Sequence, residues 1–192
     1  MIRLGLTGGI GMGKSTVASI FAANDIPSFN ADEAVHALQK PHGAAIEALA
    51  AAFPDLVTNG VLDRAGLRAL VLTNSDKMRT LEQIMHPLVR KAREDFLERV
   101  QDKKAVLFDI PLLFETKAQA EFNKIIVVSC PRSLQITRVL QRGLKLSEVE
   151  AIISKQMPDE QKRAQADYVI ENGGSIESTT TQVEMFIKEL GL

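Results

Sequence analysis

A glycine-rich loop between a short apolar run and a helical pattern constrains the fold of this chain more than any other feature. Residues 8–15 read Gly-Gly-Ile-Gly-Met-Gly-Lys-Ser and match the pattern G-x-x-x-x-G-K-[S/T]. The run at residues 2–6 predicts a buried strand, and Val17, Ile20 and Phe21 fall near one face of a helix. A loop in this setting is typical of proteins that bind phosphate groups.

Each part of the loop suits a phosphorylated nucleotide. Glycines let successive backbone N–H groups surround a phosphate without obstruction by a Cβ atom, and a helix that begins near Lys14 points its positive end at the anion. We expect Lys14 to reach the β- and γ-phosphates, Ser15 to place its hydroxyl on Mg²⁺, and Thr16 to contact the α-phosphate. The predicted nucleotide-binding residues here are Thr7, Gly8, Gly9, Gly11, Met12, Gly13, Lys14, Ser15 and Thr16.

Composition argues against several other classes of protein. The chain has 23 Lys and Arg against 24 Asp and Glu, so no global field attracts a nucleic acid or an anionic membrane. Only 5% of the residues are aromatic and Trp is absent, which argues against a base-stacking surface. The single cysteine argues against a disulfide framework and a cysteine-rich zinc module. We read no signal peptide, and the longest apolar stretch is too short to span a bilayer. We expect a cytoplasmic protein without a nucleic-acid or membrane partner, and leave monomer or homo-oligomer open.

Apolar runs alternating with helical patterns predict an α/β fold. Five runs read as buried strands, which favours a doubly wound parallel sheet. One interval, residues 31–104, is too long for a single crossover helix and contains no good strand, so we predict an inserted helical sub-domain. Within it, His86-Pro87 should kink or divide a long helical pattern. The five predicted strands are residues 2–6, 26–29, 105–109, 124–129 and 168–170.

Several kinds of phosphate-loop protein are possible. A GTPase should carry Asn-Lys-x-Asp after a strand, but residues 123–126 read Asn-Lys-Ile-Ile and precede one. A small chain with a helical insertion and arginines on late helices favours a small-molecule kinase. A nucleoside monophosphate kinase and a nucleotide-gated regulatory module remain alternatives.

Blocks of the sequence resemble the dephospho-CoA kinase family in the family's order, across nearly the whole chain. The phosphate loop is shared by many families, whereas Asp-x-Pro-Leu-Leu-Phe-Glu at 109–115 and Gln-x-x-Arg at 135–138 are far more specific. Two positions depart from the family pattern, with Asn30 where Asp is common and Met12 where Ser is common. The matching blocks are residues 6–17, Ala31-Asp32 with His36, residues 85–88, residues 109–115, Gln135 with Arg138 and Arg142, Gln156-Met157 with Lys162 and Ala166-Asp167, and Ile170 with Asn172-Gly173.

The resemblance implies ATP-dependent phosphorylation of the ribose 3′-hydroxyl of dephospho-CoA, which gives CoA and ADP in the last step of CoA biosynthesis, with Mg²⁺ as the metal. It divides the chain into a nucleotide-binding core at residues 1–30 and 105–192, a helical lid at about 136–163 and a CoA-substrate-binding insertion at 31–104. The lid pattern includes a helix starting at Ser147, with Glu150 closing a capping box.

The catalytic set implied by the resemblance is Asp32, Lys14 and Arg138. Asp32 would accept a hydrogen bond from the attacking hydroxyl, although an N-cap is the alternative. Asp109, at a strand end, would support the metal or the substrate, unless it is only a polar strand terminus. Arg138 and Arg142 share one helix face with Gln135 and would clamp phosphate oxygens, unless that face is simply solvated.

The remaining predictions concern the substrate and the base of the nucleotide. His36, His86, Asp109 and Leu113 are predicted to contact the substrate; for His86, a structural position at a helix kink is equally plausible. Asn172 and Gly173 follow the last strand and would form a backbone-lined loop for adenine, or else an ordinary strand-to-helix turn.

Overall fold

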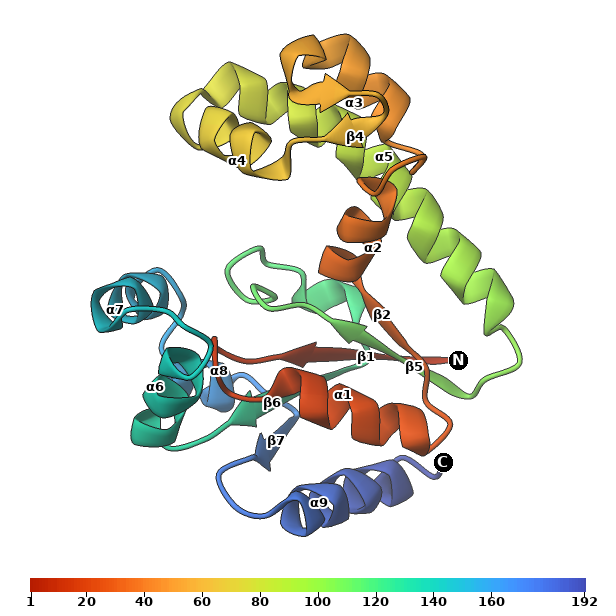
Figure 1. Ribbon diagram of the computed structural model, residues 1–192. Coiled ribbons are helices and arrows are strands. Elements are labelled where there is room, and N and C mark those ends of the chain that lie inside the picture. Colours follow the sequence, from red (N-terminus) through yellow and green to blue (C-terminus); the bar gives the residue numbers. More distant parts are fainter. The chain divides into compact units, whose positions relative to one another are not determined.

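A five-stranded sheet with order β2-β5-β1-β6-β7 places β1 at its centre (Figure 1). The computed structural model describes all 192 residues. β1 is parallel to β5 and to β6, and β6 is parallel to β7. The predicted five-stranded parallel α/β architecture is confirmed. The strands are β1 (Ile2–Thr7), β2 (Ser28–Asn30), β5 (Ala105–Asp109), β6 (Lys124–Ser129) and β7 (Tyr168–Glu171).

The chain divides into two units. The first consists of Met1–Phe29 and Val100–Leu192 and carries the sheet, and the second is Asn30–Arg99. The second unit falls in the long interval between the second and third strands of the sheet. Each unit has its own apolar cluster, as expected for segments that pack independently. No helix in the chain is long and apolar enough to cross a bilayer.

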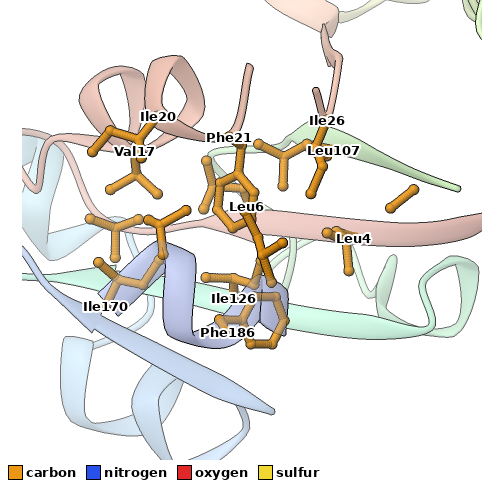
Figure 2. Close-up of a cluster of buried hydrophobic side chains, with 14 of the residues drawn as sticks. Leu4, Leu6, Val17, Ile20, Phe21, Ile26, Leu107, Ile126, Ile170 and Phe186 are labelled. Carbon is orange, nitrogen blue, oxygen red and sulfur yellow. The ribbon is translucent and has the colours of Figure 1, made fainter. Parts of the chain in front are cut away.

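Successive side chains of each strand point to opposite faces of the sheet, and apolar side chains are buried on both faces. Leu6 and Ile126 face one cluster together with α1 (Lys14–Ala23) and α9 (Ile176–Glu189). Figure 2 shows Phe21 of α1 and Phe186 of α9 within this cluster, and their rings meet edge to face at 6.3 Å between centroids. On the second face, Ile125 and Val127 of β6 pack with Leu113 and Phe114 from the segment after β5.

Three helices follow β6 in the segment predicted as a lid: α6 (Arg132–Leu140), α7 (Leu146–Ser154) and α8 (Asp159–Ala164). The predicted helix start at Ser147 with Glu150 is wrong. The helix begins at Leu146, and Glu148 Oε2 accepts the Lys145 N–H at 2.7 Å. The capping carboxylate therefore lies two residues earlier. A 3₁₀ turn, η2 (Gln119–Glu121), precedes β6.

The second unit is helical but contains a small hairpin that the sequence analysis missed. Strands β3 (Val57–Thr58) and β4 (Val61–Leu62) pair antiparallel around Asn59-Gly60. Asn59 has φ 52° and Gly60 has φ 74°, the signs that a two-residue hairpin turn requires. The expectation of no strand in residues 31–104 is therefore wrong. The helices of this unit are α2 (Ala31–Leu38), α3 (Ile46–Ala52), η1 (Pro54–Leu56), α4 (Arg64–Thr73) and α5 (Ser75–Arg99).

Pro87 does not divide the long helix of the second unit. α5 runs without a break from Ser75 to Arg99 with Pro87 inside it. Proline deprives the Gln83 carbonyl of its helical donor, but both residues are exposed, so water can satisfy that carbonyl. The expected division at His86-Pro87 is therefore wrong.

Neighbouring residues of α9 allow a direct test of the core. Phe186 is 3% exposed and Met185 is 54% exposed. We expect Phe186→Ala to lower the free energy of unfolding by about 3–5 kcal/mol, because it leaves a cavity beside Phe21. Met185→Ala should change it by less than about 0.5 kcal/mol. Urea unfolding of both variants measures the difference, and similar values would contradict this account of the core.

Candidate functional site

The glycine-rich loop connects β1 to α1 at the centre of the sheet. Gly11 has φ 77° and Gly13 has φ 90°, conformations that residues with a Cβ atom rarely adopt. A Cβ atom on Gly13 would lie 1.9 Å from Asn172 Nδ2. Gly13 also precedes α1 without a side-chain cap, so no side-chain oxygen competes with an anion for the first N–H groups of the helix.

A cavity of about 280 Å³ lies over this loop. Arg142, Ile152 and Gln156 from the lid segment line it together with Pro111. The predicted residues that line it are Gly8, Gly9, Gly11, Gly13, Lys14, Ser15, Thr16 and Arg142. The structure therefore brings most of the predicted phosphate site together around one concave space.

Thr7 and Met12 lie beneath the loop instead of in the cavity wall. Thr7 is fully buried, and its hydroxyl donates to the Pro111 carbonyl at 3.2 Å. Met12 Sδ accepts the Cys130 N–H at 3.3 Å. Burial raises the pKa of the Cys130 thiol, which is buried directly after β6. The methionine that departs from the family pattern thus supports the loop from below.

Lys14 and Asp109 form the charged centre of the site. Lys14 Nζ lies 3.7 Å from Asp109 Oδ1, and both side chains are largely buried. Ser15 is exposed in the first turn of α1. A hydroxyl and a carboxylate are the oxygen ligands that Mg²⁺ prefers, and the glycine cradle fits a polyphosphate, so the residues present suit Mg²⁺ and ATP.

Arg138 and Asn172 hold the loop from behind. Asn172 Nδ2 donates to the Met12 carbonyl at 2.9 Å, and its Oδ1 accepts the Thr179 hydroxyl at 3.1 Å. Arg138 donates to the Met12 carbonyl at 3.4 Å and to the Asn172 carbonyl at 2.9 Å. The side chain of Asn172 is therefore committed to the loop. Its predicted contact with adenine, like that of Gly173, stays a prediction.

The shared helix face predicted for Gln135, Arg138 and Arg142 is only partly correct. α6 ends at Leu140, so Arg142 lies beyond the helix, where it is exposed at the cavity. Leu113 is fully buried and packs against Gly5, where a Cβ atom would lie 2.8 Å from Leu113 Cδ1. Leu113 thus has a visible packing role, and its contact with substrate stays a prediction.

Glu115 and Lys162 form a buried ion pair that sequence reasoning did not assign. Lys162 is fully buried, and its Nζ lies 2.9 Å from Glu115 Oε1. The same oxygen accepts the Met157 N–H at 2.8 Å. Burial raises the pKa of the Glu115 carboxyl, but hydrogen bonds from Lys162 and from the Met157 N–H lower it by more. The pair ties the end of the lid segment to the loop after β5.

In the second unit, Asn30 caps α2 and leaves Asp32 exposed in the first turn. Asn30 Oδ1 accepts the N–H groups of Asp32 at 2.9 Å and Glu33 at 3.1 Å. Capping, which was the alternative role for Asp32, thus belongs to Asn30. The carboxylate of Asp32 is available for another function.

Of the two predicted histidines in this unit, His36 has polar neighbours. Arg64 Nη1 contacts His36 Nδ1, and Arg64 Nε donates to Gln39 Oε1 at 3.2 Å. Arg64 and Gln39 also line a cavity of about 560 Å³ between α4 and α5. Sequence reasoning missed Arg64, because its spacing from His36 carries no local signal. His86 is exposed within α5.

The chain is similar to known proteins over nearly its whole length. The family model described as dephospho-CoA kinase matches residues 2–178. The dephospho-CoA kinase of Agrobacterium fabrum is 42% identical over 100% of this chain and 99% of its own length. That of Mesorhizobium japonicum is 45% identical over 99% of this chain and 97% of its own length.

Solved structures agree with these relatives. The protein TT1252 from Thermus thermophilus is 35% identical, with a TM-score of 0.85, and covers 98% of this chain and 97% of its own. A dephospho-CoA kinase from Campylobacter jejuni is 26% identical, with a TM-score of 0.67, over 98% and 96%. A shikimate kinase from Acinetobacter baumannii shares the fold. It is 15% identical, has a TM-score of 0.52, and covers 99% of this chain and 93% of its own.

Alanine substitutions at two glycines with the same φ can distinguish the cost of backbone strain from the cost of a steric clash. Gly13 and Gly143 both have φ 90°, but a Cβ atom on Gly143 meets nothing within 4 Å. Each Gly→Ala change should cost about 1–2 kcal/mol for the left-handed backbone. Gly13→Ala should in addition displace Asn172 and abolish ATP binding measured by calorimetry. Normal ATP binding by Gly13→Ala would contradict the cradle described here.

The Glu115–Lys162 pair predicts a pH-dependent stability. Glu115→Gln should cost about 3–5 kcal/mol at pH 7, because it leaves a buried ammonium without its partner. The folded pKa of Glu115 is lowered. The stabilisation of the fold by the ion pair is therefore complete above the unfolded pKa of about 4.3. It is lost as the pH falls through the folded pKa of Glu115.

Urea unfolding of wild type and Glu115→Gln over a descending pH series measures this effect. The difference in the free energy of unfolding between wild type and Glu115→Gln should decrease at acid pH. The exposed control Glu160→Gln should differ little from wild type at any pH. A gap for Glu115→Gln that is constant across the series would refute the assignment.

Proposed function

The chain belongs to the dephospho-CoA kinase family, and we propose that it transfers the γ-phosphoryl group of ATP to the ribose 3′-hydroxyl of dephospho-CoA, which gives CoA and ADP. The observation that carries this proposal is the cavity over the phosphate loop, where Lys14, Asp109, Ser15 and Arg142 surround a glycine cradle. This set of groups suits phosphoryl transfer, which depends mainly on positioning and on stabilising charge.

The chain's own groups supply most of that stabilisation. The ammonium of Lys14 offsets negative charge on the β- and γ-phosphates, and the exposed guanidinium of Arg142 can clamp phosphate oxygens from the lid side. Arg138 holds the loop through the Met12 and Asn172 carbonyls and is the second arginine that a closing lid would bring to the phosphates. Ser15 would hold Mg²⁺, with Asp109 in support, and the metal would supply further neutralisation of phosphate charge.

Asp32 is the proposed partner of the attacking hydroxyl. Its carboxylate accepts a hydrogen bond from the 3′-hydroxyl, orients that oxygen, and takes its proton as the bond to phosphorus forms. Support comes from its position just after β2 and from its freedom from capping, which Asn30 performs. We further propose that the second unit, with His36 and His86, binds the CoA substrate and that residues 136–163 act as the lid.

The release of ADP with a panel of acceptors tests the reaction. We expect ADP to form when dephospho-CoA is added to enzyme, ATP and Mg²⁺, and not when AMP, CMP or UMP is added. A product that carries the new phosphate on the ribose 3′-oxygen would complete the assignment. ADP formation with a nucleoside monophosphate alone would favour the nucleoside monophosphate kinase alternative, and no acceptor-dependent ADP would favour a regulatory module.

Asp32 and Glu33 form a matched pair, because both are exposed acidic residues in the first turn of α2. We expect Asp32→Asn to lower kcat by roughly 10²–10⁴-fold through loss of the proton acceptor, with ATP affinity unchanged. Glu33→Gln should keep near-normal kcat. Steady-state kinetics and calorimetry make the comparison, and a near-normal kcat for Asp32→Asn would remove Asp32 from the mechanism.

A further inference from the structure

Residue Ile10 of the phosphate loop is held on both sides by glutamine side chains. Gln135 Nε2 donates to the Ile10 carbonyl at 2.8 Å, and the Ile10 N–H donates to Gln156 Oε1 at 3.1 Å. Gln135 lies in α6, and Gln156 follows α7. Side chains from just before the lid segment and from its second half therefore meet the loop at one residue.

The loop is shaped to receive both side chains. A Cβ atom on Gly9 would lie 3.1 Å from Gln135 Nε2 and 3.3 Å from Gln156 Oε1. Such contacts are tight, so a larger residue at position 9 would push the glutamines away. The close approach shows that this side of the loop is built around the two amides.

The orientation of the Gln156 amide follows from its partner. The Ile10 N–H can only donate, so the oxygen of the Gln156 amide must face it and the NH₂ group must face away. Gln156 lines the cavity over the phosphate loop and also a neighbouring cavity of about 530 Å³ that it shares with Gly9 and Met12, and its NH₂ group has no hydrogen-bond partner within the chain. A donor thus remains available at the wall of the phosphate site.

This wall lies near the position expected for the terminal phosphate. Lys14, which reaches β- and γ-phosphates, runs back along the start of the loop, since its Cγ lies 3.5 Å from the Cβ position of Gly8. Gly9 and Ile10 follow directly. The end of the phosphate chain nearest Lys14 therefore lies beside the residue that Gln156 holds.

Gln156 also stands on a firm support. The next residue, Met157, donates its N–H to Glu115 Oε1 at 2.8 Å, and Glu115 is paired with the fully buried Lys162. A side chain anchored in this way loses less conformational freedom when it binds a ligand.

We propose that Gln156 is a nucleotide-binding residue that donates its side-chain NH₂ to the terminal phosphate of a bound nucleoside triphosphate while its oxygen keeps Ile10 in place. The inference rests on the proposed function for the identity of the nucleotide. It gives the site a means of distinguishing a triphosphate from a diphosphate, because only the triphosphate extends to this donor. Gln135, whose NH₂ is bonded to the loop itself, has a structural role only.

Calorimetric titration of the full chain with ATP and with ADP, in Mg²⁺ and without any acceptor, tests the proposal. Gln156→Met keeps the side-chain length but removes the donor, and we expect it to weaken ATP binding about tenfold or more while ADP affinity falls much less. Gln156→Glu keeps an oxygen for Ile10 and loses the donor, so it should also lower the ratio of ATP to ADP affinity. Gln135→Ala should weaken both nucleotides alike, and the exposed Gln165→Ala should change neither.

Equal weakening of ATP and ADP in both Gln156 variants would show that Gln156 only supports the loop and would overturn the proposal, as would unchanged binding of both nucleotides. Thermal unfolding confirms that each variant is folded before titration. Because no acceptor is present, failure of the dephospho-CoA assignment leaves this measurement intact, and the acceptor panel remains a separate test.

Discussion

The carbonyl groups of Ile10 and Met12 are held by side chains from distant parts of the chain, and this bonding shapes the phosphate loop before any ligand binds. Gln135 holds the first carbonyl, and Asn172 and Arg138 hold the second. The chain has no cis peptide bond, so each carbonyl points opposite to the N–H of its own peptide. Fixing the two carbonyls toward the protein therefore turns the N–H groups of the following glycines away from it, toward an anion. A cradle prepared in this way pays little ordering cost when phosphate arrives.

The same bonds connect the loop to the parts of the first unit that carry the rest of the site. Arg138 and Gln135 come from α6, Asn172 follows β7, and Gln156 lies between α7 and α8. The Glu115–Lys162 pair adds a buried connection from α8 to the loop after β5. A buried ion pair is weak support for stability, since desolvation opposes it, but it specifies one geometry. Here that geometry places Met157, and with it Gln156, beside the phosphate loop.

Local sequence signals predicted the sheet and the phosphate loop, because both depend on short-range patterns. Mostly apolar runs identified β1, β5 and β6, and the glycine-lysine-serine spacing identified the loop. The hairpin at Val57–Leu62 was missed because Asn59-Gly60 joins strands of two residues each, too short to show alternation. The expected division at Pro87 was wrong because the lost hydrogen bond is exposed to water, whereas the expected kink stays a prediction. Gln156 and the burial of Lys162 could not be inferred, because their partners Ile10 and Glu115 lie 146 and 47 residues away in the sequence.

The replacement at position 30 shows how a departure from the family pattern can preserve local structure. Asn and Asp are about equally good N-caps, so Asn30 can end the strand and begin α2 as an aspartate would. What changes is charge, since one carboxylate is absent two residues before Asp32. Two neighbouring carboxylates repel each other. With Asn30 as the cap, Asp32 and Glu33 are the acidic residues of the first turn. The helix start is retained, and the carboxylate proposed for catalysis faces less like charge.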